Sequence, residues 1–212
     1  FSGNSPEEYV VYTDLCHEKG GVTTPVIMKS RQMGVVIARE PLADTTSFKS
    51  RIAHINTEED VTVNYNQDFL VTADRCHYKR MEGEDAAEIV FLSLREEGNC
   101  KVSNKRGDLI HAKEIKIHTA DRTLAFVAPK GTLLPPLSHH EIDPILFSAE
   151  SMRWEDAEGK MLLKDAVELT IKGVGTLLTD KQMELIIEKE GEQKQLGKVN
   201  ITGNTSITRL DE

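Results

Sequence analysis

The sequence VELTIK at residues 167–172 alternates apolar and polar side chains without a break. Alternation with a period of two residues is typical of a β-strand that buries one face and exposes the other. The same pattern recurs at residues 61–65, 115–118, 183–185 and 199–202. Clusters of Gly, Asn and Asp, which favour turns, separate these runs. We therefore expect a chain built mainly of short strands joined by tight turns.

One segment competes with this interpretation. Residues 85–97 are the only serious helix candidate, because Ala86, Ala87 and Glu88 could begin a helical turn. The centre of the segment, IVFLSL at residues 89–94, is more typical of a buried strand. The sequence therefore predicts an all-β fold.

The composition favours a thin and elongated body. The chain has 212 residues, of which 39% are hydrophobic and 5% are aromatic. Globular domains usually contain roughly 45–50% apolar residues. A compact body of this length would need a richer core, whereas a thin stack of strands has more surface per residue. The length suits one large domain or two small ones, and a continuous stack of strands favours one elongated domain over residues 1–212.

Charge and hydropathy argue against two classes of protein. The chain has 26 Lys and Arg residues against 35 Asp and Glu residues, a net charge of −9, and shows no basic stripe. Nucleic-acid binders need clustered basic residues to neutralise phosphates, so we expect no nucleic-acid partner. No run approaches the roughly 18 apolar residues of a membrane-spanning helix, so we expect no transmembrane segment. The first residue is Phe1 rather than Met, which indicates a processed or trimmed chain.

A degenerate repeat organises the chain. Its units begin at Asp60, Asn99 and Asp165, and the first two starts are 39 residues apart (99 − 60). The same offset from Asp165 leads to Asn204. The units pass through a polar turn and close on similar segments, Leu70–Asp74, Leu109–Lys113 and Leu177–Asp180. Repeats of this size indicate stacked supersecondary units, none of which can bury its apolar face alone.

A proline-rich segment interrupts the repeat at residues 129–147. It contains four prolines: Pro129, Pro135, Pro136 and Pro144. Proline has no N–H group to donate to a strand ladder. The segment is therefore predicted to be a loop or a crossing connection rather than a central strand.

The order of an apolar-x-apolar strand, a short turn, Leu-x-(Ala/Thr)-Asp and a further alternating strand resembles the OstA-like lipopolysaccharide-transport family. This family comprises LptA, LptC and the periplasmic N-terminal domain of LptD. The resemblance is clearest over residues 151–211 and looser at residues 60–79 and 99–117. The stretches that carry it are MRWEDAEGK at 152–160, LKDAVEL at 163–169, GTLLTDK at 175–181 and GKVNITGN at 197–204. Units of the family often carry Gly-Asn before the apolar strand, as residues 98–99 and 203–204 do here.

The resemblance implies an elongated, twisted, U-shaped β-jellyroll of stacked antiparallel strands with an apolar interior groove. It implies a periplasmic protein without catalysis or cofactor that takes part in outer-membrane biogenesis in a Gram-negative-type cell. The implied ligand is lipopolysaccharide or lipooligosaccharide, with acyl chains in the groove and sugars outside. The implied protein partners are other OstA-like transport proteins, or a second copy of the chain, joined head to tail through open sheet edges. A membrane anchor, as some such proteins have, would lie outside this sequence.

Alternation gives the side chains that should point inward and line the groove. An inward set of this kind either binds lipid or packs a dry core, and both interpretations stay open for each residue. The groove candidates are Val61, Val63, Ile110, Ile115, Ile117, Val167, Leu169, Ile171, Leu178, Met183 and Leu185.

Sites for metal ions and catalysis are not predicted. Adjacent residues on a strand point to opposite faces, so the dipeptides Cys16-His17 and Cys76-His77 do not offer two ligands to one metal. Stacked strands could bring Cys16 near Cys76, which leaves a disulfide and two free thiols as alternatives. The segment 191–198 has five residues between its glycines, where a phosphate-binding loop needs four.

Two other functions remain as alternatives. The first is a stacked-β scaffold that binds proteins by edge-strand addition and holds no lipid. The second is a carbohydrate-active β-solenoid enzyme with paired carboxylates, although the acidic runs lie in turn-like stretches.

Overall fold

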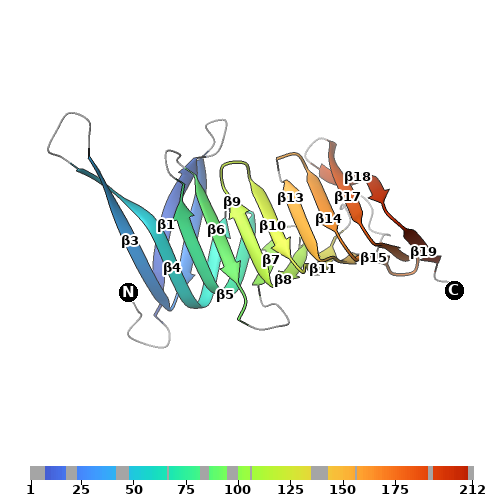
Figure 1. Ribbon diagram of the computed structural model, residues 1–212, viewed down its shortest axis with the longest axis horizontal. Helices are drawn as coiled ribbons and strands as arrows, with labels where there is room; N and C mark the ends of the chain where they lie inside the picture. The colour runs from blue at the N-terminus through green and yellow to red at the C-terminus, as the bar shows by residue number, and fades with distance from the viewer. Residues whose placement is uncertain are drawn as a thin grey trace.

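The computed structural model is an all-β body of antiparallel strands (Figure 1). It describes residues 8–17, 23–41, 48–65, 67–81, 86–94, 100–105, 107–134, 143–155, 157–190 and 193–209. The predicted all-β class is confirmed, and the described residues contain no helix. The helix candidate at 85–97 instead contributes the strand β6 (Ala87–Leu92), as its apolar centre indicated.

The strands form two walls that face each other. Both walls include parts of β4 (Phe48–Tyr65) and β5 (Phe69–Arg80), whose pairing shifts register between Glu58 and Val61. In spatial order, wall I contains β3 (Gln32–Pro41), the first half of β4, the second half of β5, β6, β9 (Glu114–His118), β10 (Thr123–Val127), β13 (Ser151–Glu155), β14 (Lys160–Lys164), β17 (Gln182–Glu190) and β18 (Gln193–Thr202).

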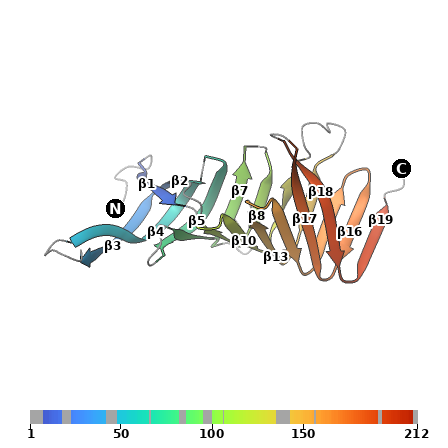
Figure 2. The same ribbon diagram turned by 90° about the horizontal axis from the view of Figure 1, so that it is seen from above.

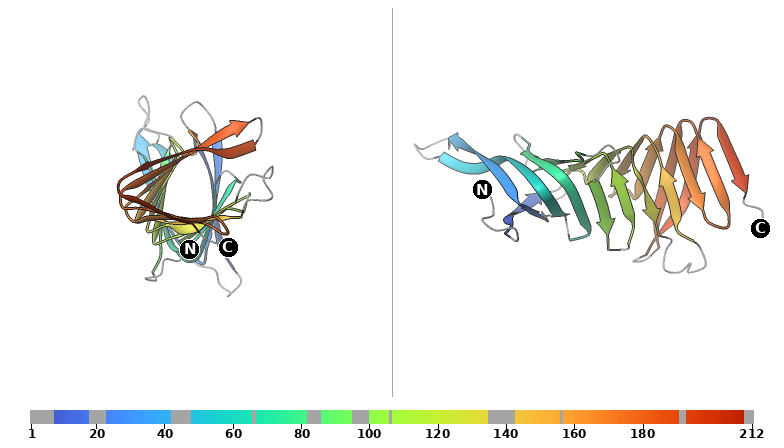
Figure 3. Two further views of the ribbon diagram at one scale, coloured as in Figure 1. Left: turned by 90° about the vertical axis from the view of Figure 1, so that its right-hand side faces the viewer. Right: turned by 90° about the horizontal axis from the view of Figure 1, so that it is seen from below.

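Wall II uses the other halves of β4 and β5. In spatial order it contains β1 (Val10–His17), β2 (Thr23–Ser30), the second half of β4, the first half of β5, β7 (Cys100–Asn104), β8 (Leu109–Ala112), β11 (Lys130–Leu133), β12 (Ile145–Ser148), β15 (Val167–Ile171), β16 (Gly175–Thr179) and β19 (Thr205–Arg209). The stack is long, with the two ends of the chain at opposite ends of it (Figure 2). Seen along its length, the walls face each other across a common interior (Figure 3).

Among the described residues, the chain passes between the walls along one long side, and we call this line of crossings the corner seam. It runs through residues 30–32, 58–61, 73–75, 112–114, 127–130, 148–151, 164–167, 179–182 and 202–205. Backbone hydrogen bonds join successive crossings. The N–H of Glu150 donates to the Asp165 carbonyl (3.0 Å), and the N–H of Asp165 donates to the Lys181 carbonyl (2.6 Å). The other long side carries hairpin turns, such as the one between β13 and β14.

The starts of the sequence repeat fall on equivalent crossings. Asp60, Asp165 and Asn204 each precede or open a strand segment of wall II. The backbone there turns sharply, with φ of 53° at Asp60 and 59° at Asp165, and φ of 111° at Gly203 next to Asn204. Asn99 lies outside the described residues. Between Asp165 and Asn204, the 39-residue offset therefore corresponds to a set of strands that brings the chain to the equivalent crossing one rung further along the seam.

The aspartate that closes two of the repeat units holds the seam together. Asp74 accepts a hydrogen bond from the backbone N–H of Leu94 (2.8 Å). Asp180 accepts two from Asn204, one from its backbone N–H (2.8 Å) and one from its side-chain amide (2.7 Å). These hydrogen bonds hold the pKa of Asp180 below its ordinary value.

The prediction that residues 129–147 form only a loop or crossing is wrong. Residues 130–133 are β11 and residues 145–148 are β12, and both pair on two sides within wall II. Pro129 and Pro144 lie directly before these strands, where a missing N–H costs no ladder hydrogen bond. Residues 135–142, which include the other two prolines, lie outside the described part of the chain. The segment is thus a further rung of the stack.

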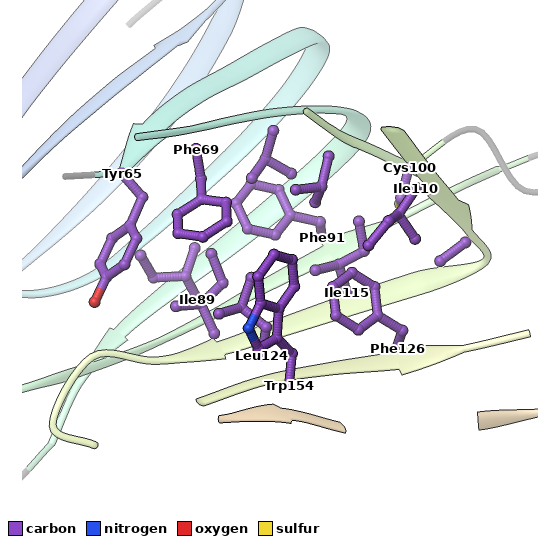
Figure 4. Packing of buried hydrophobic residues seen from close by; sticks show 14 of the residues in the cluster. Tyr65, Phe69, Ile89, Phe91, Cys100, Ile110, Ile115, Leu124, Phe126 and Trp154 are labelled. Carbon is purple, nitrogen blue, oxygen red and sulfur yellow. The ribbon is translucent and has the colours of Figure 1, made fainter. Parts of the chain in front are cut away.

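Aromatic side chains fill the centre of the interior. The ring of Phe69 in wall II meets Trp154 of wall I edge to face, with centroids 5.4 Å apart. Phe91 and Phe126 lie in the same packed group and are 2% exposed or less. Figure 4 shows these rings beside Ile115 and Leu124. The middle of the stack is therefore a solid core.

Gly131 in β11 gives a direct test of how tightly this core is packed. A Cβ atom at residue 131 would collide with the Leu109 carbonyl and meet the Phe147 ring at 3.1 Å. We expect Gly131→Ala to lower the free energy of unfolding by about 1–3 kcal/mol, because neighbouring backbone and ring must shift. Chemical denaturation measures the change.

The matched control is Gly34→Ala in β3, where the nearest atom to a new Cβ is the Asn56 carbonyl oxygen at 3.9 Å. That distance is an ordinary contact, so the free energy of unfolding should stay within about 0.5 kcal/mol of the parent protein. Equal effects of the two substitutions would contradict the packing of β11 against β8 and β12.

Candidate functional site: the interior between the walls

Apolar side chains form continuous rows along the inner faces of both walls. In wall I, cross-strand pairing places Phe91, Ile115, Phe126, Met152, Leu163, Met183 and Ile201 in one row. A second row of wall I runs Ile89, Ile117, Leu124, Trp154, Met161, Leu185 and Val199. In wall II the corresponding row is Val63, Val71, Val102, Ile110, Gly131, Phe147, Leu169, Leu177 and Ile207. The interior thus has an apolar lining from β4 to the last strands.

Most of the sequence-predicted groove candidates point into this interior. Eight of them are 2% exposed or less: Val61, Val63, Ile110, Ile115, Ile117, Val167, Met183 and Leu185. Leu169 and Ile171 are half-buried, and Leu169 packs against the core. The structure gives the orientation of these side chains and contains no ligand, so their role in binding lipid stays a prediction.

Leu178 is the exception, and its predicted inward orientation is wrong. Its side chain is 42% exposed and lies opposite Glu168 on the outer face. Leu177 takes the inward place opposite Leu169 and packs against the core. Two adjacent leucines interrupt the alternation, so the sequence alone does not show which of them points inward.

The interior opens towards the C-terminal end. Val199, Ile201 and Ile207 are on the inner rows, yet they are 40%, 36% and 74% exposed. Among the described strands, β18 pairs only with β17 and β19 only with β16, so no further strand covers these side chains. Sequence reasoning omitted all three, although the alternation at residues 199–202 already marked Val199 and Ile201 as one face of a strand. This end offers accessible apolar surface that the packed centre lacks.

A polar cluster lies inside the opposite end. Asp14 of β1 accepts hydrogen bonds from the Tyr78 hydroxyl (2.6 Å) and from the Arg80 guanidinium (2.7 Å) of β5. The Asp14 and Arg80 side chains are 16% and 15% exposed. Burial, and then the nearby Asp14 carboxylate, raise the pKa of Tyr12, whose ring packs on Tyr78. The cluster ties the edge strand of wall II to wall I.

The cysteines supply no metal site or reactive nucleophile in the described residues. Cys76 and Cys100 are buried free thiols. Burial raises the pKa of Cys76, and it raises the pKa of Cys100 to about 12. His77 points away from Cys76 and its ring nitrogen lies 2.7 Å from the Asn56 side chain. The described residues hold no group of three or more metal-ligating side chains.

The free thiol of Cys76 leaves no disulfide with Cys16, whose side chain lies outside the described part of the structure. His139 and His140, another adjacent pair that offers no two ligands to one metal, also lie outside it.

The outer face of wall I carries interleaved charges of both signs. Lys160 contacts Glu184 (2.6 Å), and the Glu184 pKa is held below its ordinary value by Lys160 and Asn200. His118 lies 3.7 Å from Glu88 on the same face. Part of the chain's Asp and Glu content therefore belongs to ion pairs on the solvated outer face of a sheet rather than to a catalytic site.

Comparison with known proteins adds no assignment. No protein-family model matches the chain, and no curated protein or solved structure matches it at a significant level. The described residues contain no helix long and apolar enough to cross a membrane. The interior, the open ends and the outer faces of the walls are the features of the described residues that can carry a function.

The burial of the two thiols predicts their reactivity. In a Cys16→Ser variant, we expect neither Cys76 nor Cys100 to react with a thiol reagent at mildly alkaline pH while the protein is folded. The raised pKa values leave almost no thiolate, and burial blocks access of the reagent. Both should react once denaturant is added, and a colorimetric thiol assay counts them. Rapid reaction of either thiol in the folded protein would contradict their burial.

Proposed function

We propose that the chain is an OstA-like periplasmic protein that binds lipopolysaccharide or a related lipid and passes it along without catalysis. In this proposal the acyl chains lie between the walls and the sugars stay outside. The observation that carries it is the set of apolar inner rows, which end in accessible side chains at β18 and β19. The sequence resemblance over residues 151–211 covers this same end of the stack.

Apolar burial is large enough to hold an acyl chain there. Each methylene removed from water contributes about 0.8 kcal/mol, so a chain of about ten methylenes gains about 8 kcal/mol before ordering costs. Leu169, Leu177 and Ile207 form the inner row of wall II at this end. They become progressively more accessible towards the last strand, from half-buried at Leu169 and Leu177 to 74% exposed at Ile207. The net charge of −9 does not itself point to a lipid, and it requires the phosphates of a bound lipid to remain in solvent.

The open edges support an end-to-end association. At the N-terminal end, β1 pairs only with β2 and β3 only with β4 among the described strands. At the other end, β18 and β19 each have one described neighbour. Unpaired strand edges accept a further strand from another chain. A partner of the same fold would continue both the hydrogen-bonded ladder and the apolar interior.

A second candidate function is a scaffold that binds proteins through these edges and holds no lipid. The observation in its favour is the solid centre, where Phe69 and Trp154 meet across the two walls. A lipid that occupied the full length of the stack would have to displace these rings. We therefore place the acyl chains at the C-terminal end, and the two candidates differ in whether that end captures lipid.

Adjacent residues of β16 give a matched test of lipid capture. A photo-crosslinking amino acid at Leu177, which faces inward, should trap lipopolysaccharide several-fold more than the same group at Leu178, which faces outward. Both positions lie on one strand and differ mainly in the face that they present. Mass spectrometry of the crosslinked product identifies the lipid. Equal labelling at the two positions would overturn lipid capture and leave the scaffold.

The exposed inner residue of β19 tests the end-to-end association. We expect Ile207→Asp to weaken concentration-dependent self-association measured by sedimentation velocity, because a carboxylate would be buried at the junction. Thr208→Asp is the control, since Thr208 is exposed on the outer face of the same strand. If both variants associate as the parent protein does, the C-terminal end is not the junction.

A further inference from the structure

The outer face of wall II differs in charge from the rest of this acidic chain. Cross-strand pairing places its outward residues in two rows, one from Lys29 to Ser206 and one from Ile27 to Thr208. The charged or titratable positions on these rows are Lys29, Lys101, His111, Lys130 and Glu168. Glu168 is the one acidic side chain on the two rows. Asp60 and Asp74 lie beside the two rows on the corner seam. Asp60 pairs with the Arg31 guanidinium, and Asp74 accepts a hydrogen bond from the backbone N–H of Leu94.

Three of these basic residues are direct neighbours, and we call them the basic row. Lys101 of β7 lies opposite His111 of β8, and His111 lies opposite Lys130 of β11. The strands beside them place the uncharged Thr72 and Ser148 next to the lysines. Directly opposed like charges destabilise a sheet. Burial and the charges of the two lysines lower the pKa of His111, because both disfavour the protonated imidazole.

Leucines line the side of the basic row, two of them exposed and one, Leu109, half-buried. Leu70 of β5, Leu109 of β8 and Leu146 of β12 lie on the neighbouring outward row. Leu70 and Leu146 are 42% and 50% exposed. A single exposed leucine needs no explanation, but leucines beside a basic row form a face that is both apolar and cationic. On wall I, by contrast, the cations lie beside acids such as Glu88 and Glu184.

We propose that this face of wall II, formed by the basic row with Leu70, Leu109 and Leu146, docks on an anionic lipid surface. The lysines would contact lipid phosphates, and the leucines would enter the boundary between headgroups and acyl chains. Charge complementarity points to an anionic surface as the partner. The chain has a net charge of −9, yet Glu168 is the one Asp or Glu side chain on these two rows.

The geometry favours an extended surface over one small anion. Neighbouring strands lie about 4.8 Å apart, so the backbones of Leu70 on β5 and Leu146 on β12, four strand spacings apart, are separated by about 19 Å across the sheet. A small anion held between Lys101 and Lys130 would leave both leucines in solvent, whereas a bilayer presents headgroups and apolar boundary across the whole face. The inner faces of the same strands carry Val102, Ile110 and Gly131. Docking therefore uses the opposite side of wall II from the interior, and it does not depend on lipid capture there.

Vesicle cosedimentation tests the docking face. The parent protein should bind vesicles of phosphatidylcholine with phosphatidylglycerol at low salt and should not bind vesicles of phosphatidylcholine alone. Replacing Lys101 and Lys130 by Gln should weaken binding by about fivefold for each lysine removed. The control is Lys79→Gln with Lys116→Gln on the outer face of wall I, which changes the net charge equally and should leave binding nearly unchanged.

A second variant keeps the test independent of charge. Leu70→Asn with Leu146→Asn should reduce vesicle binding at raised salt, where the lysines are screened. Thermal unfolding of each variant establishes that it is folded.

Four outcomes would overturn the proposal. The first is an equal loss of vesicle binding in the two lysine double variants, and the second is equal binding of the parent protein to neutral vesicles. The third is a change in self-association of the leucine variant without vesicles, and the fourth is a change in the NMR signals of His111 on adding inorganic pyrophosphate to a protein that binds no vesicles. The third would make the face an interface between copies, and the fourth would make it a site for free anions. Crosslinking at Leu177 reports on the interior, and its control Leu178, although on the same outward row, lies three strands beyond Lys130. Failure of docking is therefore distinguishable from failure of lipid capture.

Discussion

The corner seam is the constraint on which the rest of the molecule depends. Each crossing between the walls exposes backbone groups that must be paired, and successive crossings pair with each other, as Glu150, Asp165 and Lys181 do. These bonds set the register of each new pair of strands. Since a shift of one residue would move every side chain to the opposite face, the seam decides which residues line the interior and which face solvent.

One seam produces two kinds of interior. In the middle of the stack, every strand has neighbours on both sides and the opposite wall supplies aromatic rings, so residues such as Ile115 become fully buried. At the last strands the same inward orientation leaves Ile207 exposed, because no further rung follows among the described residues. Core and candidate groove therefore share the inward orientation of their side chains. They differ in position along the stack and in the aromatic rings that only the centre contributes.

This dependence explains how far the sequence could be interpreted. Alternation and turn residues predicted the strands, and the spacing of Asp60, Asp165 and Asn204 marked equivalent crossings, because both signals are local. The orientation of Leu177 and Leu178 was not local, since only the pairing with β15 separates them. The rung at residues 129–147 was missed because a proline excludes a strand only where its missing N–H is needed. Pro129 and Pro144 stand just before β11 and β12, where it is not needed.

The basic row could not be predicted from local sequence either, and the twist of the sheet determines what it can contact. Lys101, His111 and Lys130 are far apart in sequence and become neighbours only through the register of β7, β8 and β11. Adjacent strands rotate by about 20–25° relative to each other, so a flat surface can touch only a few successive strands of wall II. The basic row spans three strands, and Leu70 and Leu146 extend the face by one strand on each side. The twist then turns both ends of the stack away from that plane, so a docked molecule keeps its open edges accessible.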